Sequence, residues 1–490
     1  MTAAVWIAIA VYGALGLVVA WMSRRGMGGG LAEYYLAGRR VGGVVSALSY
    51  GATTYSAFMM VGLVGLTYAG GVGALGFELI YLAGLGLVVI FGPRFWLIGR
   101  ERGHITPAEM LGDRYDSRLL AGLVALASCV FLIPYSAVQL MGIGYLLSGV
   151  SDDAIPFSAG ILIGGAFTLI WTLAAGLRSV LWTDVLQVAI MLVTSLVALG
   201  FVVTALGGPG AFIDTVEAGH GEWLAVPGPG LFDFVTFVGL TLPWLFFSIS
   251  NPQVSQRLFT TRSLGAMRTM IIGFLVLGFV YTLISVLWGF AAVQLVPGLE
   301  QADLATPRLL RSGAVPVGVA VILMVGIMAA AVSTVDSILL ALASMVSRDV
   351  YRPLIRAGRG PGELAAGKAV VLAVTAVALG FAYLRLDLIS ILSVASSIGL
   401  LVTVPAIVGA FFWRRGTAAG AVTSVAVAGT AVTVLQLTGY DPLGVPVGIW
   451  SLVLATALFV GVSYATEPPA ARAAIFIDDV DAALRRHRIR

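Results

Sequence analysis

The chain has 490 residues, of which 59% are hydrophobic and 11% are charged, with a formal net charge of +4. Its mean hydropathy of +1.01 fits a membrane protein with many spans and excludes an ordinary soluble domain, in which about 25% of residues are charged. One cysteine and three scattered histidines exclude a disulfide framework and argue against a cysteine- or histidine-based metal site.

Thirteen apolar stretches of membrane-spanning length follow one another along the chain. We therefore expect an all-α integral membrane protein with about 13 transmembrane helices. The stretches begin near Ala4, Val44, Leu75, Leu119, Phe157, Ser179, Phe234, Leu264, Val315, Leu364, Ile389, Thr417 and Val445.

The basic residues predict the orientation of these spans. If the gap after the first span faces the cytoplasm, all but three of the 28 Lys and Arg residues lie on that side, the exceptions being Arg308, Arg311 and Arg385. No basic residue precedes the first span, whereas Arg24 and Arg25 follow it. The sequence thus predicts a retained first helix rather than a cleaved signal peptide, with the N-terminus outside and the C-terminus inside the cell's inner (plasma) membrane.

The chain is expected to be a single transmembrane domain with no soluble one. The longest outside gap, 207–233, has too little apolar sequence for a core, and the tail 466–490 is either a short basic helix on the inner leaflet or a solvated segment. No G-x-x-x-x-G-K-[ST] loop occurs, so ATP is not expected to be the energy source. Neither an enzymatic activity, nor nucleic acid binding, nor an obligatory protein partner is indicated, and the lipid bilayer is the expected surrounding.

The second span, "SALSYGATTYSAFMMVGLVGLTYAGG" (46–71), is a poor sequence for an unbroken helix. Its first half combines glycines with the run of hydroxylated residues 53–56. A break there would free backbone carbonyls to bind a cation, as in discontinuous transporter helices.

The seventh span, "TLPWLFFSISNPQ" (241–253), shows a similar interruption signal because Pro243 and Pro252 enclose polar and aromatic residues. Two interrupted spans that lie five spans apart predict an inverted repeat. Its halves would be 44–206 and 234–413, with one extra helix at 4–22 and two at 417–465.

The ninth span carries a polar cluster in its middle, where "AAAVSTVDSILLALAS" (329–344) places Ser333, Thr334, Asp336 and Ser337 together. A carboxylate at membrane depth costs roughly 2.5–3.5 kcal/mol on insertion scales, so a compensating partner is expected. At 100° per residue Ser333, Asp336 and Ser337 share one face. The hydroxyls could simply bond their own helix, but we favour a site for a hard cation such as sodium.

Several motifs resemble the sodium:solute symporter family, whose members transport proline, pantothenate, monocarboxylates, sialic acid and sugars. The matching segments are "EYYLAGRRVGG" (33–43), "GLRSVLWTDVLQ" (176–187), "NPQVSQR" (251–257), "AAAVSTVDSILL" (329–340) and "GAFFWRRGTAAGA" (409–421). The resemblance covers nearly the whole chain and implies a LeuT-type five-plus-five inverted-repeat core preceded by one additional helix.

The resemblance also implies a sodium site, with Na+ as the coupling ion. Its ligands would be the backbone carbonyls of Ala52, Tyr55 and Ala330 and the hydroxyls of Ser333 and Thr334.

A second cation or proton site is implied by the resemblance to some members of the family. It would comprise Asp184, Ser333, Asp336 and Ser337, but Asp336 is a carboxylate where those members have a hydroxyl. The residues therefore leave three alternatives open: a second sodium ion, a proton, or a polar network. For Asp184, an N-cap interaction or a pair with Arg178 is an equally good interpretation.

The solute pocket is expected near the middle of the membrane, between the two interrupted spans and the third and fourth. Glu78 aligns with a position at which sugar-transporting relatives carry a glutamate. No Lys or Arg is expected at this depth, so the solute is expected to be amino-acid-like, carboxylate-bearing or polyhydroxylated. The candidate residues are Thr54, Met59, Glu78, Gln139, Trp244, Phe247 and Ser248.

The sequence thus predicts a secondary active symporter that couples inward Na+ movement to uptake of a small polar organic solute by alternating access. Two alternatives remain. One is a proton-coupled symporter of the same fold that uses Asp184, Asp336 or Glu78, and the other is a membrane solute sensor.

Overall fold

The computed structural model describes residues 2–487 apart from 25–29, 228–232, 356–360 and 386–388. Some of the sequence predictions fall outside the described residues. They concern Arg25, residues 228–232 of the predicted outside gap 207–233, and residues 488–490 of the predicted tail 466–490. Where the chain is described it is helical, and the β-type pairing found there is a parallel bridge between Val41 and Thr261.

The helices follow one another through short connections. In the first half of the chain they are α1 (Thr2–Arg24), α2 (Leu31–Leu36), α3 (Gly43–Thr54), α4 (Leu63–Gly70), α5 (Gly73–Arg102), α6 (Pro107–Arg114), α7 (Arg118–Ser151), α8 (Phe157–Ala205), α9 (Pro209–His220), α10 (Phe234–Ser250), α11 (Pro252–Ser255) and α12 (Leu264–Leu295). In the second half they are α13 (Ala305–Arg311), α14 (Val317–Met345), α15 (Arg352–Ile355), α16 (Pro361–Ala382), α17 (Ile389–Leu400), α18 (Val404–Phe412), α19 (Ala418–Thr423), α20 (Gly429–Thr438), α21 (Val447–Tyr464), α22 (Ala470–Ala474) and α23 (Val480–Arg486).

The thirteen predicted spans are confirmed. Among the described residues, 12 helical segments are long and apolar enough to cross a membrane, and the bent pair Gly43–Thr54 and Phe58–Gly70 supplies one more. The fifth and sixth spans are joined in α8 at Gly176, whose φ of 60° and ψ of −155° interrupt the helix. Each segment corresponds in order to one of the apolar stretches expected from the sequence.

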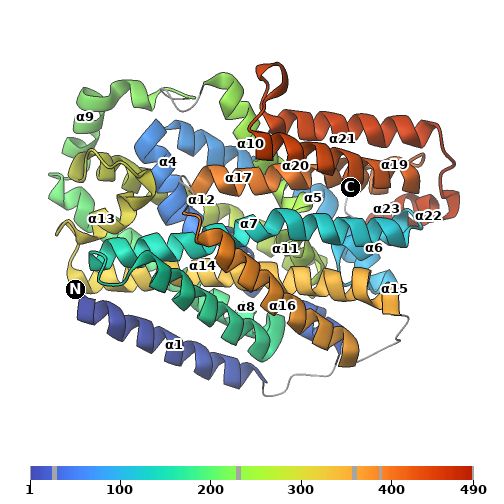
Figure 1. Cartoon of the computed structure of the whole chain (residues 1–490), viewed down its shortest axis with the longest axis horizontal. Helices are drawn as coiled ribbons and strands as arrows, with labels where there is room; N and C mark the ends of the chain where they lie inside the picture. The colour runs from blue at the N-terminus through green and yellow to red at the C-terminus, as the bar shows by residue number, and fades with distance from the viewer. Residues whose placement is uncertain (1, 25–29, 228–232, 356–360, 386–388, 488–490) are drawn as a thin grey trace.

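The connections collect at the two ends of a long bundle, whose longest helices run roughly parallel to one another (Figure 1). Helices α9 and α13 lie at one end, and α6, α15 and α22 lie at the other (Figure 1). Most of the arginine-rich gaps meet at the second end, where Arg100 donates to the Thr261 carbonyl at 2.9 Å and Arg348 pairs with Glu109 at 2.6 Å. The alternation of arginine-rich and arginine-poor gaps along the chain therefore corresponds to the two ends of the bundle. The assignment of the arginine-rich end to the cytoplasm stays a prediction.

The ninth span, α14, forms the centre of the bundle and packs against α7, α8 and α16. Its polar and apolar residues from Gly326 to Met345 are all buried. By contrast α1 lies at the edge of the bundle (Figure 1) and exposes large apolar side chains such as Ile7 and Trp21, as expected for a helix that faces lipid.

The second span is broken as expected. Helix α3 ends at Thr54, the next residue Tyr55 leaves helical geometry with φ −91° and ψ 88°, and the two halves are bent by 51°. The Ser56 hydroxyl then accepts the Phe58 N–H at 3.1 Å, which helps the chain to restart as a π-helical turn, Phe58–Gly62. The seventh span is interrupted at Asn251, between α10 and α11, whereas Pro243 lies within α10.

The C-terminal tail differs from both sequence interpretations, because its apolar face packs on the protein. The described part runs through α22, a π-helical turn (Ile475–Asp479) and α23, and it buries Phe476, Val480 and Leu484. The Phe476 ring lies 5.8 Å from that of Phe411 on α18. The sequence shows that these residues are apolar, but not which surface covers them.

Candidate functional site

The break in the second span brings backbone oxygens to the polar cluster of the ninth. The carbonyl oxygens at the end of α3 lack the N–H donors that a further helical turn would supply. The Thr334 hydroxyl on α14 lies 3.1 Å from the carbonyl oxygens of both Ala52 and Ala330, and 3.4 Å from that of Thr53. These uncharged oxygens are ligands that suit a small hard cation.

The other two residues expected at this sodium site are placed differently. Tyr55 lies at the break itself, directly after α3. The Ser333 hydroxyl donates to Asp184 Oδ1 instead of joining the carbonyls around Thr334. Of the five expected ligands, the structure therefore brings Ala52, Ala330 and Thr334 into direct contact.

A second polar cluster lies beside the first, around the buried carboxylate of Asp184 in the second half of α8. Asp184 Oδ2 accepts a hydrogen bond from the Ser49 hydroxyl on α3 at 2.5 Å. Ser337 on α14 lies 3.1 Å from the Thr53 hydroxyl, whereas Asp336 accepts from Thr172 at 2.7 Å. The expected N-cap role of Asp184 is not seen, because its carboxylate bonds to side chains of α3 and α14.

Sequence reasoning missed the partner that completes this cluster, Arg257. It lies in the short 3-10 helix Gln256–Phe259, is 4% exposed, and has its Nη2 atom 3.6 Å from Asp184 Oδ2. The sequence analysis places Arg257 with the charges of a cytoplasmic gap, whereas the structure buries it among three spans. The available signal was the "NPQVSQR" motif, whose arginine was counted with the cytoplasmic charges because it follows the apolar part of the span.

A small cavity of about 10 Å³ lies directly beyond the helix break. Its walls are mostly aromatic and come from the second, third, fourth and seventh spans, namely Thr54, Tyr55, Phe58, Glu78, Tyr81, Tyr135, Trp244 and Phe247. A space of that size is on the scale of one water molecule, so a larger solute needs the aromatic walls to separate.

Glu78 is the one acidic side chain that lines this cavity, and it is 1% exposed. Its Oε2 atom accepts a hydrogen bond from the Trp244 indole N–H at 3.3 Å. The Trp244 ring centre lies 5.5 Å from that of Phe58 and 5.1 Å from that of Phe247. The seventh span therefore contributes an aromatic wall with one polar contact to the third.

Four of the seven residues expected in the solute pocket line this cavity: Thr54, Glu78, Trp244 and Phe247. Met59, Gln139 and Ser248 are buried but do not line it. Neither polar atom of the Gln139 amide has a hydrogen-bond partner among the described residues, which marks it as available to a bound molecule.

Phe58, Tyr81 and Tyr135 are lining residues that sequence reasoning missed, and Tyr55, expected only at the sodium site, also lines the cavity. Helical spacing offered a signal, because Tyr81 lies three residues after Glu78 and Tyr135 four residues before Gln139. The Tyr81 hydroxyl lies 3.4 Å from the Thr54 hydroxyl and thus connects the third span to the helix break.

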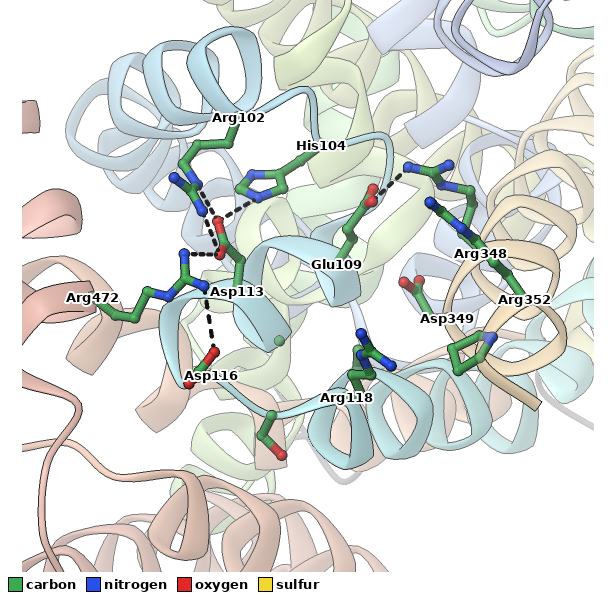
Figure 2. A pocket seen from close by; sticks show the side chains of 14 residues that line it. Arg102, His104, Glu109, Asp113, Asp116, Arg118, Arg348, Asp349, Arg352 and Arg472 are labelled. Atoms are coloured by element: carbon green, nitrogen blue, oxygen red, sulfur yellow. Dashed lines mark hydrogen bonds and ion pairs between the residues drawn. The ribbon is translucent and has the colours of Figure 1, made fainter. Parts of the chain in front are cut away.

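A much larger cavity, of about 850 Å³, lies at the arginine-rich end and is lined by charged side chains (Figure 2). Asp113 is its most connected acid, with Arg102 at 2.5 Å, His104 at 2.9 Å and Arg472 of the tail at 2.7 Å. Burial raises the pKa of Asp113, but hydrogen bonds and positive charge from His104 and Arg102 outweigh that effect and hold the pKa well below its usual value. Most of the lining charges are already paired, and these ion pairs join the elements around the cavity.

Comparison with known proteins connects this arrangement to a group of transporters. The chain is 29% identical over 467 residues to the sodium/pantothenate symporter of Escherichia coli, covering 93% of this chain and 95% of that protein. It is 27% identical over 435 residues to the sodium/proline symporter of Haemophilus influenzae, covering 82% of each chain.

Solved structures show the same fold. A Na+-coupled sialic acid symporter in a substrate-bound outward-open state superimposes with a TM-score of 0.76 at 19% identity, covering 95% of this chain and 98% of that one. Mhp1, a nucleobase-cation-symport-1 family transporter, gives a TM-score of 0.57 at 16% identity, covering 90% and 98%. The chain therefore has the LeuT-type fold of sodium-coupled transporters.

The family model described as "Sodium:solute symporter family" matches residues 34–428, which include the helix break, the ninth span and the cavity. The family model and the sodium symporters among the relatives show a transporter in which Na+ is the coupling ion. The chain belongs to the sodium:solute symporter family.

Proposed function

We propose that this protein uses inward Na+ movement to take up a small organic solute that carries both a carboxylate and hydroxyl or amide groups, by alternating access. In this proposal the sodium ion binds where Thr334 meets the carbonyls of Ala52 and Ala330, with Ser333 and Tyr55 joining as further ligands. The solute occupies the aromatic cavity, with Glu78 and Trp244 as its polar contacts and Gln139, Met59 and Ser248 next to it.

The observation that carries the proposal is that one helix break contributes residues to both the proposed sodium site and the aromatic cavity. Ala52 and Thr53 turn their carbonyls to Thr334, while the next two residues, Thr54 and Tyr55, line the cavity. A cation that binds the carbonyls orders the break and so also positions the cavity wall. Such a shared element gives sodium and solute a favourable coupling free energy.

The chemistry of the cavity supports this solute class. The Glu78 carboxylate accepts hydrogen bonds, which suits a hydroxyl or amide N–H of the solute, and the aromatic walls suit an apolar section between polar ends. The cavity lining includes no Lys or Arg, so a solute carboxylate would be neutralised by the nearby sodium ion. The symporter for pantothenate, a hydroxylated carboxylate, is a relative over nearly the full length of this chain.

The remaining parts of the proposal concern the whole chain. We place the N-terminus outside and the C-terminus inside the inner (plasma) membrane, in line with the distribution of basic residues. The two interrupted spans support an inverted repeat formed by 44–206 and 234–413, which would rock about the shared site to open each side in turn.

Uptake by purified protein in sealed liposomes tests the proposal. An inward Na+ gradient should drive accumulation of radiolabelled pantothenate, and a K+ gradient should not; unlabelled pantothenate should compete better than proline or sialic acid. Glu78→Gln should raise the half-saturating solute concentration about tenfold, because a mispaired buried polar group costs roughly 1–3 kcal/mol. Its sodium activation should not change.

Glu217→Gln, an exposed acid on α9, is the matched control and should behave as wild type. Sodium-independent accumulation would contradict the coupling, and better competition by proline or sialic acid would contradict the solute class. A wild-type half-saturating concentration in Glu78→Gln would remove Glu78 from the pocket.

A further inference from the structure

The C-terminal segment formed by α22, its π-helical turn and α23 (470–486) has no part in the proposed cycle, although it is docked on the bundle. It lies across the arginine-rich end, with α22 next to α6 (Figure 1). Its apolar side chains at positions 473, 476, 480, 483 and 484 are between 0 and 5% exposed. Because burial of apolar surface keeps the segment in place, the elements that it contacts are joined through it.

The membrane spans form two groups at this end. Helix α5 packs mainly against α10 and α12, and α12 also packs against α3, whereas α7, α8, α14 and α16 pack against one another. The proposed sodium site lies between α3 of the first group and α14 of the second. The aromatic cavity is lined by residues of α5 and α10 and by Tyr135 of α7. Opening these sites to the arginine-rich end therefore requires the two groups to move relative to each other.

One side of the segment is attached to α6, which belongs with the second group. Arg472 pairs with Asp113 of α6 at 2.7 Å and with Asp116, just after that helix, at 3.4 Å. Helix α6 packs on α7, and its buried Arg114 donates to the Ala410 carbonyl of α18 at 2.9 Å. The segment, α6 and α18 therefore form one connected unit.

The other side of the segment reaches α5, in the first group. Asp481 Oδ1 on α23 lies 3.2 Å from Arg94 Nη2, and the same guanidinium lies 4.6 Å from the centre of the Phe412 ring on α18. Helix α5 ends at Gly103, which has a φ of 78°, and a short loop then leads into α6. Because this loop links the two helices covalently, α5 can leave α18 only by pivoting near Gly103. Arg94 lies about two and a half turns from that point, where the pivot produces a displacement.

We infer that the segment 470–486 is a clamp that keeps the arginine-rich end closed, and that its Arg94–Asp481 ion pair breaks each time α5 moves away from α18 to release solute. The inference rests on the alternating access of the proposed function. The Asp481 side chain is 41% exposed, and an ion pair that reaches solvent contributes little stability, so it can break in every cycle. The buried apolar contacts keep the clamp attached to α6 and α18 meanwhile.

A chemical bridge across the ion pair tests the clamp. Cys129 is the one cysteine of the chain, so a Cys129→Ala background leaves only the introduced thiols. Arg94→Cys/Asp481→Cys joined by a flexible bis-maleimide should lose Na+-driven uptake in liposomes by about tenfold or more, because the required movement is blocked. The same protein treated with N-ethylmaleimide, which joins nothing, should keep its uptake.

The matched control is a bridge on the side of the clamp that stays together. Asp116→Cys/Arg472→Cys, in the same background and with the same bis-maleimide, joins the segment to the end of α6 only. It should keep its uptake, because no movement between these residues is needed. A general effect of rigidity would instead reduce uptake in both bridged proteins.

Weakening the ion pair should favour the open state. Phe91 on α5 is 3% exposed and lies 5.4 Å from the Phe412 ring, so Phe91→Cys, again with Cys129→Ala, reports separation of α5 from α18 through its labelling by a water-soluble maleimide. Adding Asp481→Asn should speed this labelling about two- to fivefold, as expected for loss of an exposed ion pair. Adding Arg486→Gln, an exposed residue on the same helix, should not.

Uptake that persists after the 94–481 bridge would overturn the inference, and so would an equal loss of uptake after the 116–472 bridge. Unchanged labelling with Asp481→Asn would overturn it even if the cysteine pairs do not fold. Uptake by the wild type that needs no Na+ gradient would instead contradict the proposed function.

Discussion

Thr334 shows how much a single hydroxyl can matter when it lies between two spans. Its oxygen lies within hydrogen-bond distance of a carbonyl of the broken second span and of a carbonyl in its own helix. It therefore contacts both spans that form the proposed sodium site. Thr375 is also buried, but its hydroxyl donates only to a carbonyl of its own helix. The difference can be tested because valine has the shape of threonine without its oxygen.

We expect Thr334→Val to raise the Na+ concentration for half-maximal uptake roughly tenfold, equivalent to about 1.4 kcal/mol, because one oxygen ligand is lost. Thr334→Ser keeps the oxygen and should remain near wild type. Thr375→Val removes a hydroxyl that is buried at 1% exposure but donates to Val371, and it should leave the sodium titration unchanged. Equal titrations for all three variants would place the ion elsewhere.

At the scale of elements, one glycine allows two spans to be joined without a loop. Gly176 has a positive φ combined with ψ near −155°, a region that is essentially limited to glycine. A Cβ atom there would lie 2.7 Å from the backbone oxygen of Tyr34. The turn between the fifth and sixth spans therefore depends on the absence of a side chain at this position.

Gly176→Ala should lower the melting temperature of the detergent-solubilised protein, since the backbone strain costs about 1–3 kcal/mol before the contact with Tyr34 is counted. Gly200→Ala is the matched control on the same helix, where a Cβ atom meets nothing within 4 Å. It should leave the melting temperature unchanged or slightly higher, because alanine favours helix. Equal melting temperatures would mean that this turn relaxes.

The spans and their breaks could be predicted from the sequence because both depend on local properties. Apolar length gives each helix, and glycines with clustered hydroxyls mark the break at Tyr55. Arg257 could not be placed because its role depends on Asp184, which lies 73 positions away on another helix. Tyr135 was missed for a similar reason: an aromatic residue in a span looks the same whether it faces lipid, a neighbour or a cavity.

At the scale of the whole molecule, ion pairs join segments that are far apart in the chain. Asp113 binds Arg102 and His104 beside it and Arg472 of the tail, so that one carboxylate connects the α5–α6 loop to α22 (Figure 2). Its lowered pKa means that the folded state favours the ionised form. The resulting stabilisation is present above the unfolded pKa of about 3.9 and is lost as the pH falls below it.

Asp113→Asn should therefore lower the melting temperature at pH 7, and the difference from wild type should shrink as the pH is lowered from 5 to 3. The reason is that the unfolded wild-type chain binds a proton at Asp113 in this range, whereas the folded state, in which the pKa is lower, does not; the variant has no carboxyl group to titrate. Asp153→Asn, an exposed acid at the other end of the bundle without an ion pair among the described residues, should show no such trend. A difference that is constant with pH would assign the effect to packing instead of charge.

The docked tail also has a consequence for the surface of the bundle. Phe476, Val480 and Leu484 cover apolar surface of the preceding helices, with the Phe476 ring beside Phe411 on α18. If α22 and α23 undocked, that surface would be open and would favour association with other apolar surfaces. The segment that closes this end of the bundle therefore also protects it from aggregation.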